Sequence, residues 1–420
     1  MIQELQLDAG RRPRRRQWLF RLLVLVPLLI GQEVVCRLVF PLPEVAGFNR
    51  IRYQRLAPGD ARSRAILQRG LVYDRLKFES RPDGFSEVHR LNRYGFRGSD
   101  FTIEPLPGRR RILILGDSVV EGQGASETAA ISGVLTSLFN KDGIAAEVIN
   151  LGVVAASLSE LTLLARDSVP LLKPNDVILV LYANDLPAPP YPSAFDLPAP
   201  MFRQRSGLAP RLLELLVRAG SNQPIYRRWP QHPVVPFFLP VPDPSNPWTG
   251  LNDAPAGLDR PLFEAMSAGE LNPWLWEQSK AIPAMLSHDF SRGNGSPAPY
   301  LERIASLCRA QNAHLVVAYV PFCGVTNSRY SDSLVKMGME QSIAEALDSD
   351  PIYRRQNEIL ASVCEDLNLP LADTTDALRQ AEAEGTPQYW SFDTHPRPEG
   401  CATIAAQIYR SWRDSQPSRR

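Results

Sequence analysis

The pattern of hydrophobic and polar positions contains five short and almost uninterrupted apolar runs from residue 110 onward. They lie at 110–117, 146–153, 176–185, 314–321 and, more weakly, 369–375. Runs this apolar predict strands that are covered on both faces, as in a parallel sheet. Helical patterns lie between the runs, at 127–141, 157–172, 298–312, 353–367 and 399–412. This alternation predicts an α/β fold with a doubly wound, flavodoxin-like parallel sheet of about five strands.

One long segment breaks the alternation. Residues 186–300 hold 21 of the 38 prolines and four of the seven tryptophans, and only 209–220 and a stretch near 259–287 have helical patterns. A loop of this length in a compact domain is usually functional or disordered, and its aromatic residues argue against disorder. We therefore expect an inserted cap at 187–297, between the two parts of the sheet domain at 108–186 and 298–415.

The segment before the sheet, residues 41–107, is mixed and polar. Residues 71–79 alternate enough to predict a strand, and 91–101 is typical of a turn-rich connection. We expect this segment to be an N-terminal extension that packs on the main domain.

The first forty residues place a basic run, Arg11 to Arg16, before an apolar stretch at 18–40. This order is typical of a signal sequence or a signal anchor, and Arg21 and Arg37 could extend to the membrane interface. We expect residues 1–17 to be a cytoplasmic basic tail, 18–40 a signal anchor or transmembrane helix, and the rest of the chain to lie on the periplasmic or extracytoplasmic side. A cleaved signal peptide and an amphipathic helix of a soluble protein are the alternatives.

Composition excludes several classes of function. The net charge of the 420-residue chain is only +1 and no basic face dominates, so we expect no nucleic-acid partner. The five cysteines include no pair with C-x-x-C spacing, which argues against a zinc or redox site and leaves either one disulfide or free buried thiols. No metal-binding constellation and no phosphate loop occurs, so no metal and no cofactor is expected.

Polar residues with catalytic potential follow three of the predicted strands. Ser118 ends the first strand, Asn184 and Asp185 end the third, and Asp393 and His395 lie just before the last helix. Ligands of open α/β sheets bind beyond the carboxyl ends of the strands. A serine needs a base to remove its proton and a third group to orient that base, and Asp393 is close enough in sequence to steer the His395 imidazole.

These residues resemble the sequence blocks of the SGNH (GDSL-type) hydrolases, of the membrane-anchored type. The resemblance covers roughly 91–186 and 298–412: GDS at 116–118, Asn184-Asp185, Asp393-Thr394-His395-Pro396, and the lead-in NRYGFRG at 92–98. It implies a Ser118–His395–Asp393 catalytic triad, with Asp117 and Asp185 in supporting roles. It also implies an oxyanion hole from the Ser118 backbone, a backbone N–H of the second block and the Asn184 side chain.

The second and third blocks depart from the family pattern. The second-block glycine falls on Ala155, and Gly152 comes three residues earlier as a weaker candidate; the third-block glycine is replaced by Tyr182 or Ala183. Alanine still donates its N–H, but only glycine reaches positive φ cheaply. The expected consequence is a weakened oxyanion hole, and losing one donor can cost about 10²–10³ in rate.

The resemblance implies an esterase that acts on small acyl esters or an acylated carbohydrate, with O-acetyl groups of cell-surface polysaccharides as the expected substrates. A carbohydrate O-acyltransferase would use the same triad, so the sequence leaves that alternative open. A non-catalytic module that binds a glycan or a partner is the third hypothesis; Ala155 favours it, and the intact Ser118, Asn184, Asp393 and His395 oppose it.

Overall fold

The computed structural model shows two separate parts of the chain. Helix α1 (Arg12–Val39) belongs to one part and every other described element to the other. The residues that the structure describes are 12–39, 45–46, 75–92, 94–154, 156–186, 252–291 and 295–416.

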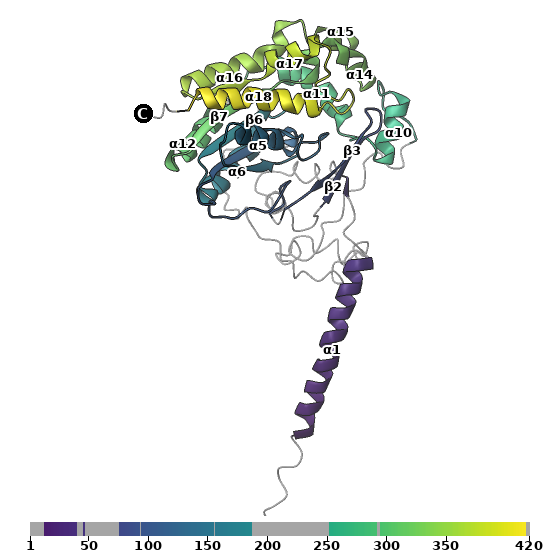
Figure 1. Ribbon diagram of the computed structural model, residues 1–420. Coiled ribbons are helices and arrows are strands. Elements are labelled where there is room, and N and C mark those ends of the chain that lie inside the picture. Colours follow the sequence, from purple (N-terminus) through teal and green to yellow (C-terminus); the bar gives the residue numbers. More distant parts are fainter. Residues whose placement is uncertain are drawn as a thin grey trace, which may run out of the picture. The chain divides into compact units, whose positions relative to one another are not determined.

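The centre of the larger part is a five-stranded sheet, which confirms the predicted fold class (Figure 1). All its neighbouring strands are parallel, in the order β5-β4-β6-β7-β8. This order is the flavodoxin-like one, in which the direction of winding reverses beside the first strand. The strands are β4 (Arg110–Gly116), β5 (Ala146–Gly152), β6 (Asp176–Tyr182), β7 (His314–Val320) and β8 (Leu371–Asp373).

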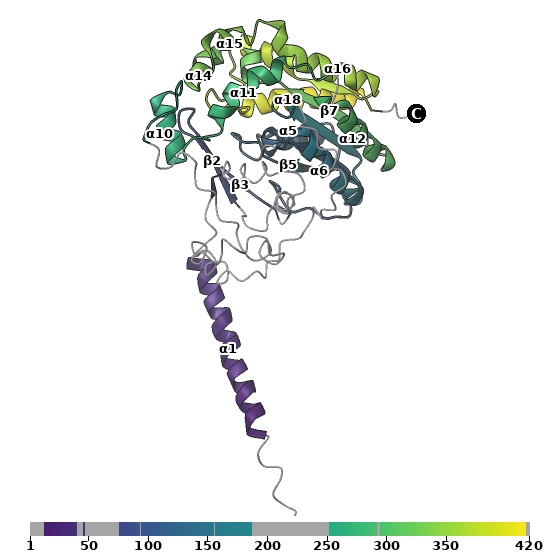
Figure 2. The same ribbon diagram turned by 180° about the vertical axis from the view of Figure 1, so that it is seen from behind.

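Helices cover both faces of the sheet, as Figures 1 and 2 show from opposite sides. Leu113 and Leu115 of β4 pack into one core, and the alternate residues Ile112 and Ile114 pack into the other. The first core includes α6 (Leu158–Leu172), α12 (Ala298–Ala310) and α16 (Arg355–Asp366); the second includes α5 (Ile131–Lys141), α17 (Thr375–Ala383) and α18 (Pro398–Asp414). Burial on both faces explains why the strands read as continuous apolar runs.

A second, smaller sheet precedes the main one in the chain. It contains β1 (Val45–Ala46), β2 (Arg75–Ser80) and β3 (Phe85–Arg90), with β2 and β3 joined as an antiparallel hairpin. Strand β2 overlaps the segment 71–79 where alternation predicts a strand, whereas β3 has no counterpart in the sequence predictions.

The predicted cap falls mostly outside the described residues, including the helical pattern at 209–220. Its remaining part forms two helices, α10 (Arg260–Ala268) and α11 (Leu275–Ser287), where the sequence shows one helical stretch. Ile282 and Leu286 of α11 lie in the second core beside the sheet. This portion is therefore packed into the domain, and the division of the chain into domains remains a prediction.

Short helices between β7 and α16 complete the domain: α13 (Cys323–Thr326), α14 (Ser331–Lys336), α15 (Gln341–Ala346) and the 3-10 turns Ser328–Tyr330 and Pro351–Arg354. All five cysteines are unpaired, and four of them are buried. The sequence left either one disulfide or free buried thiols open, and the structure has free thiols.

Within α1, residues Arg21–Val39 are long and apolar enough to cross a membrane by length and composition. A signal sequence near the N-terminus passes the same test.

Candidate active site

Ser118 lies at the carboxyl end of β4, where the strand turns sharply into the short helix α4 (Ser118–Glu121). The turn requires the small residue before it: a Cβ on Gly116 would lie 2.2 Å from Val120 Cγ2 and 2.9 Å from the Val180 carbonyl oxygen. The helix begins at an Asp117 cap, whose Oδ1 accepts the Val119 N–H at 2.9 Å. Tight packing therefore fixes where the Ser118 hydroxyl is presented.

Asp393 and His395 lie in a tight turn just before α18. The Thr394 N–H donates to the Trp390 carbonyl and the Trp390 N–H donates to the His395 carbonyl, both at 2.9 Å. Thr394, between the acid and the imidazole, has φ of +66°, a left-handed conformation that β-branched residues rarely adopt. This conformation bends the chain so that side chains two positions apart face each other.

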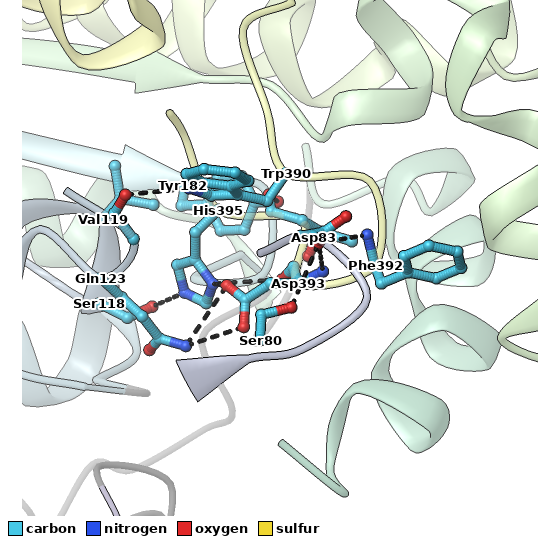
Figure 3. Close-up of polar contacts among 12 residues, drawn as sticks. Ser80, Asp83, Ser118, Val119, Gln123, Tyr182, Trp390, Phe392, Asp393 and His395 are labelled. Atoms are coloured by element: carbon cyan, nitrogen blue, oxygen red, sulfur yellow. Dashed lines mark hydrogen bonds and ion pairs between the residues drawn. The ribbon is translucent and has the colours of Figure 1, made fainter. Parts of the chain in front are cut away.

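The two segments meet in one chain of hydrogen bonds (Figure 3). The Ser118 hydroxyl donates to His395 Nε2 at 2.7 Å, and His395 Nδ1 donates to Asp393 Oδ1 at 2.5 Å. All three side chains are buried, with relative exposures of 5% for Ser118, 6% for His395 and 1% for Asp393. The structure thus brings together the three residues expected to carry catalysis, although 277 positions separate Ser118 from His395.

The charge of Asp393 decides the protonation of His395. Burial alone would lower the pKa of the imidazole, because it disfavours the charged form. The neighbouring Asp393 carboxylate, with a smaller contribution from Asp117, outweighs burial, so the pKa of His395 lies above its ordinary value. The arrangement therefore favours an imidazole that accepts a proton from Ser118 and holds it as imidazolium.

Asp117 and Asp185, the two expected supporting residues, are both buried at 1% exposure. Asp117 Oδ2 lies 3.1 Å from the Ser118 hydroxyl, and Asp185 Oδ2 accepts the Tyr182 N–H at 2.8 Å. Burial raises the pKa of both carboxyls, and the charge of Asp117 raises that of Asp185 further. Asp185 thus fixes the backbone at the end of β6. Asp117 Oδ2 is a second acceptor, besides His395, within reach of the Ser118 hydroxyl proton.

Four groups are candidate hydrogen-bond donors of the oxyanion hole, and their surroundings differ. Ala155 lies outside the described residues. The Gly152 N–H donates to Asn150 Oδ1 at 2.8 Å, so a neighbouring side chain already uses it. Asn184 follows β6, the strand beside β4, and its Oδ1 is buried without a hydrogen-bond partner among the described residues. The Ser118 N–H is at the first turn of α4, where helical N–H groups have no intrahelical acceptor.

Two further residues contact Asp393 and were not predicted from the sequence. Gln123 Nε2 lies 3.3 Å from Asp393 Oδ2, and Asp83 Oδ2 accepts the backbone N–H of Asp393 at 2.9 Å. Gln123 lies in the glycine-rich stretch after Ser118, which signalled a special loop but not a hydrogen-bond donor. Asp83 lies in the turn of the β2–β3 hairpin, and its Asp-Gly turn sequence indicates only a turn.

The arrangement contains the parts that nucleophilic acyl chemistry requires: a hydroxyl, a base within hydrogen-bond reach, and an acid that orients the base. Among the residues that the structure describes, no group of three or more His, Cys, Asp or Glu side chains could hold a metal ion.

The chain belongs to the GDSL-like lipase/acylhydrolase family, whose model matches residues 114–402. No curated protein matches the chain. The family and the fold together define an esterase or acylhydrolase.

Several solved structures are similar to the chain at low identity. A lipase/acylhydrolase from Enterococcus faecalis is 12% identical, with 74% of this chain and 99% of that chain covered and a TM-score of 0.33. A member of the lipolytic G-D-S-L family from Veillonella parvula DSM 2008 is 10% identical, with 72% and 97% covered and a TM-score of 0.33. A catalytic mutant of an acetylxylan esterase from Geobacillus stearothermophilus is 12% identical, with 72% and 93% covered and a TM-score of 0.34.

Proposed function

We propose that the protein cleaves acyl esters through a Ser118–His395–Asp393 triad. The observation that carries the proposal is the continuous chain of hydrogen bonds, 2.7 Å and 2.5 Å long, that joins the three side chains. Ser118 Oγ attacks the ester carbonyl, His395 Nε2 takes its proton, and Asp393 stabilises the imidazolium. His395 then returns the proton to the leaving alcohol. In the second half of the reaction His395 takes a proton from water, which attacks the acyl carbon, and His395 gives that proton to Ser118 Oγ as the acid leaves.

The developing oxyanion needs hydrogen-bond donors beside Ser118. We propose the Ser118 N–H, the Asn184 side chain and the Ala155 N–H for this role. The position of Asn184 at the end of the strand next to β4 supports it. The occupied N–H of Gly152 is the reason to prefer Ala155 as the second-block donor.

The acyl group we propose is acetyl, and the substrate we propose is an acylated carbohydrate outside the cytoplasm. Both rest on the resemblance of the NRYGFRG segment to the lead-in of anchored members of the family. A sugar hydroxyl in place of water as acceptor would make the same residues a transferase.

We further propose that α1 anchors the chain as a single-pass helix, with its N-terminal arginines in the cytoplasm. The apolar length of Arg21–Val39 supports this placement.

The test is hydrolysis of p-nitrophenyl acetate and of longer acyl esters by the full-length protein, beside Ser118→Ala and His395→Ala. Each substitution should lower kcat by about 10⁴-fold or more, because the nucleophile and its base act as a unit. Arg410→Ala, at an exposed position of α18 where the guanidinium donates to Gln407, is the control and should leave kcat unchanged. Turnover that survives Ser118→Ala would overturn the proposal.

A fluorophosphonate probe and the pH profile separate the alternatives. Labelling of Ser118 without ester turnover would indicate a transferase that lacks its acceptor, and neither labelling nor turnover would indicate a non-catalytic binding module. For the hydrolase, kcat/KM should rise with pH through the pKa of His395, since only the neutral imidazole accepts the proton. Because Asp393 raises that pKa, this acid limb should lie above pH 6.5.

A further inference from the structure

We propose that Asp83 and Arg97, both from the segment before the main sheet, are positioning residues. Asp83 fixes the acid–base turn, which carries Asp393 and His395, and Arg97 fixes the nucleophile loop, residues 121–125 after Ser118. This inference rests on the proposed esterase function. It gives the β2–β3 hairpin and the NRYGFRG segment a role in the reaction although neither contributes a triad member.

Asp83 holds the acid–base turn by its backbone. Its Oδ2 accepts the N–H of Phe392 at 2.7 Å and that of Asp393 at 2.9 Å, and it also accepts the Ser80 hydroxyl at 3.3 Å (Figure 3). Hydrogen bonds to an ionised acceptor are roughly twice as strong as neutral ones. One carboxylate oxygen therefore fixes the two peptide units that lead into Asp393.

The hairpin that carries Asp83 is itself fixed. The Gly84 N–H donates to the Ser80 carbonyl at 2.8 Å, and the Arg81 N–H donates to the Glu270 carbonyl beyond α10 at 3.1 Å. The Phe85 ring packs against Trp390 with ring centroids 4.9 Å apart. Asp83 is thus presented by a closed turn that is docked at both sides, and it can act as a rigid support.

Arg97 holds the other half of the site. Its side chain is buried, with 4% exposure, and donates to the carbonyls of Glu121 at 2.9 Å, Gly122 at 2.7 Å and Ala125 at 2.7 Å. These three carbonyls flank Gln123, the residue whose amide reaches Asp393. The planar guanidinium can serve several carbonyls at once, which a lysine ammonium cannot do in the same geometry.

The two supports act on the same residue, Asp393, one through its side chain and the other through its backbone. Arg97 fixes the loop that brings Gln123 to Asp393, and Asp83 fixes the backbone of Asp393 itself. A displacement of about 1 Å in a catalytic group can cost about 10²-fold in rate. Loss of either support should therefore lower kcat through Asp393 and leave KM nearly unchanged, because neither residue belongs to the triad or the proposed oxyanion hole.

The experiment measures kcat, KM and the pH profile of the full-length protein with p-nitrophenyl acetate, normalised to the fraction of enzyme that a fluorophosphonate labels. Asp83→Ala should lower kcat about 10- to 100-fold and move the acid limb to lower pH, since a displaced Asp393 no longer raises the pKa of His395. Asp83→Asn keeps an oxygen acceptor and should restore most of kcat. Glu79→Ala removes a carboxylate from the same hairpin that pairs with Lys77 and Arg81, and should match wild type.

A double-mutant cycle gives the decisive result. If Asp83 acts through Asp393, Asp83→Ala should have almost no further effect in an Asp393→Ala background. Full additivity of the two substitutions, or an unchanged kcat and acid limb in Asp83→Ala, would overturn the inference. If Asp83→Ala fails to fold, Arg97→Lys decides in the same assays, with an expected loss of about 10-fold in kcat. Activity that survives Ser118→Ala would instead remove the proposed function on which the inference rests.

Discussion

The backbone conformation of Thr394 determines how Asp393 and His395 face each other in the acid–base turn. Its φ of +66° places a β-branched side chain in the left-handed region, which costs roughly 1–2 kcal/mol for an L-residue. The surrounding contacts impose this conformation: its N–H donates to the Trp390 carbonyl, and its carbonyl accepts the Tyr182 hydroxyl at 3.3 Å. Strain is thus held at the point where Asp393 and His395 face each other.

Because of this strain, we expect glycine at position 394 to give a more stable protein than alanine, the reverse of the usual order of stability. Thr394→Gly and Thr394→Ala both remove the side chain beyond Cβ, and only the glycine variant also removes Cβ. At an ordinary position alanine is more stable by about 0.5–1 kcal/mol. Here we expect the glycine variant to unfold at the higher temperature, by about 1 kcal/mol in free energy of unfolding. Thermal unfolding of the two variants checks this, and a more stable alanine variant would show that the turn is not strained.

The residues of the triad could be predicted from the sequence, and their supports could not. Ser118, Asp393 and His395 each follow a predicted strand or precede a predicted helix. Serine, histidine and aspartate are also the residue types that nucleophilic catalysis requires. Asp83 acts on backbone N–H groups about 310 positions away, and no pattern in the sequence marks a backbone acceptor at that distance. Gln123 lies in a loop whose glycines attract notice and whose amide does not.

At the scale of elements, the strands and helices of the main sheet could be predicted because both faces of the sheet are buried. The apolar runs end within one to three residues of the observed strand ends, as at 176–185 against β6 (Asp176–Tyr182). Strand β3 and helix α17 were not predicted from the sequence because each has few large apolar residues: Phe85 and Val88 in β3, and Leu378 in α17. Asn150 is a polar residue inside β5, and its side-chain amide donates to the Val120 carbonyl at 2.7 Å.

The contact between β5 and α4 predicts a role for Gly152 in packing. A Cβ at this position would lie 2.2 Å from the Glu121 nitrogen and 2.6 Å from its Cα, so α4 must move to admit it. Since α4 begins at Ser118, Gly152→Ala should lower the free energy of unfolding by about 1–3 kcal/mol and kcat by more than 10-fold. Chemical denaturation and ester hydrolysis measure the two effects.

Gly143→Ala is the matched control for Gly152→Ala. Gly143 has positive φ but open space around its Cα, so alanine there costs stability through the backbone alone and should leave kcat unchanged. A Gly152→Ala variant with wild-type kcat would contradict the packing role and would reopen the question of what Gly152 does at the site.

At the scale of the whole molecule, α1 and the hydrolase domain are different kinds of structure. The domain buries its apolar residues in two cores against the sheet, whereas α1 exposes large apolar side chains along Arg21–Val39. A helix of 19 residues is about 28 Å long, close to the roughly 30 Å of the hydrocarbon core of a bilayer. A lipid environment would cover these side chains.

We therefore expect the full-length chain to remain in the membrane pellet after an alkaline carbonate wash and to keep its N-terminal residues by intact mass. Replacing both Leu25 and Leu29 with arginine places two charges in the middle of the helix, each costing about 2.5–3.5 kcal/mol on insertion, and should release the chain from the pellet. Replacing the same leucines with isoleucine is the control and should change nothing. A mature chain that is soluble and lacks its first 30 or so residues would show instead that α1 is a cleaved signal sequence, and that the esterase domain works free of the membrane.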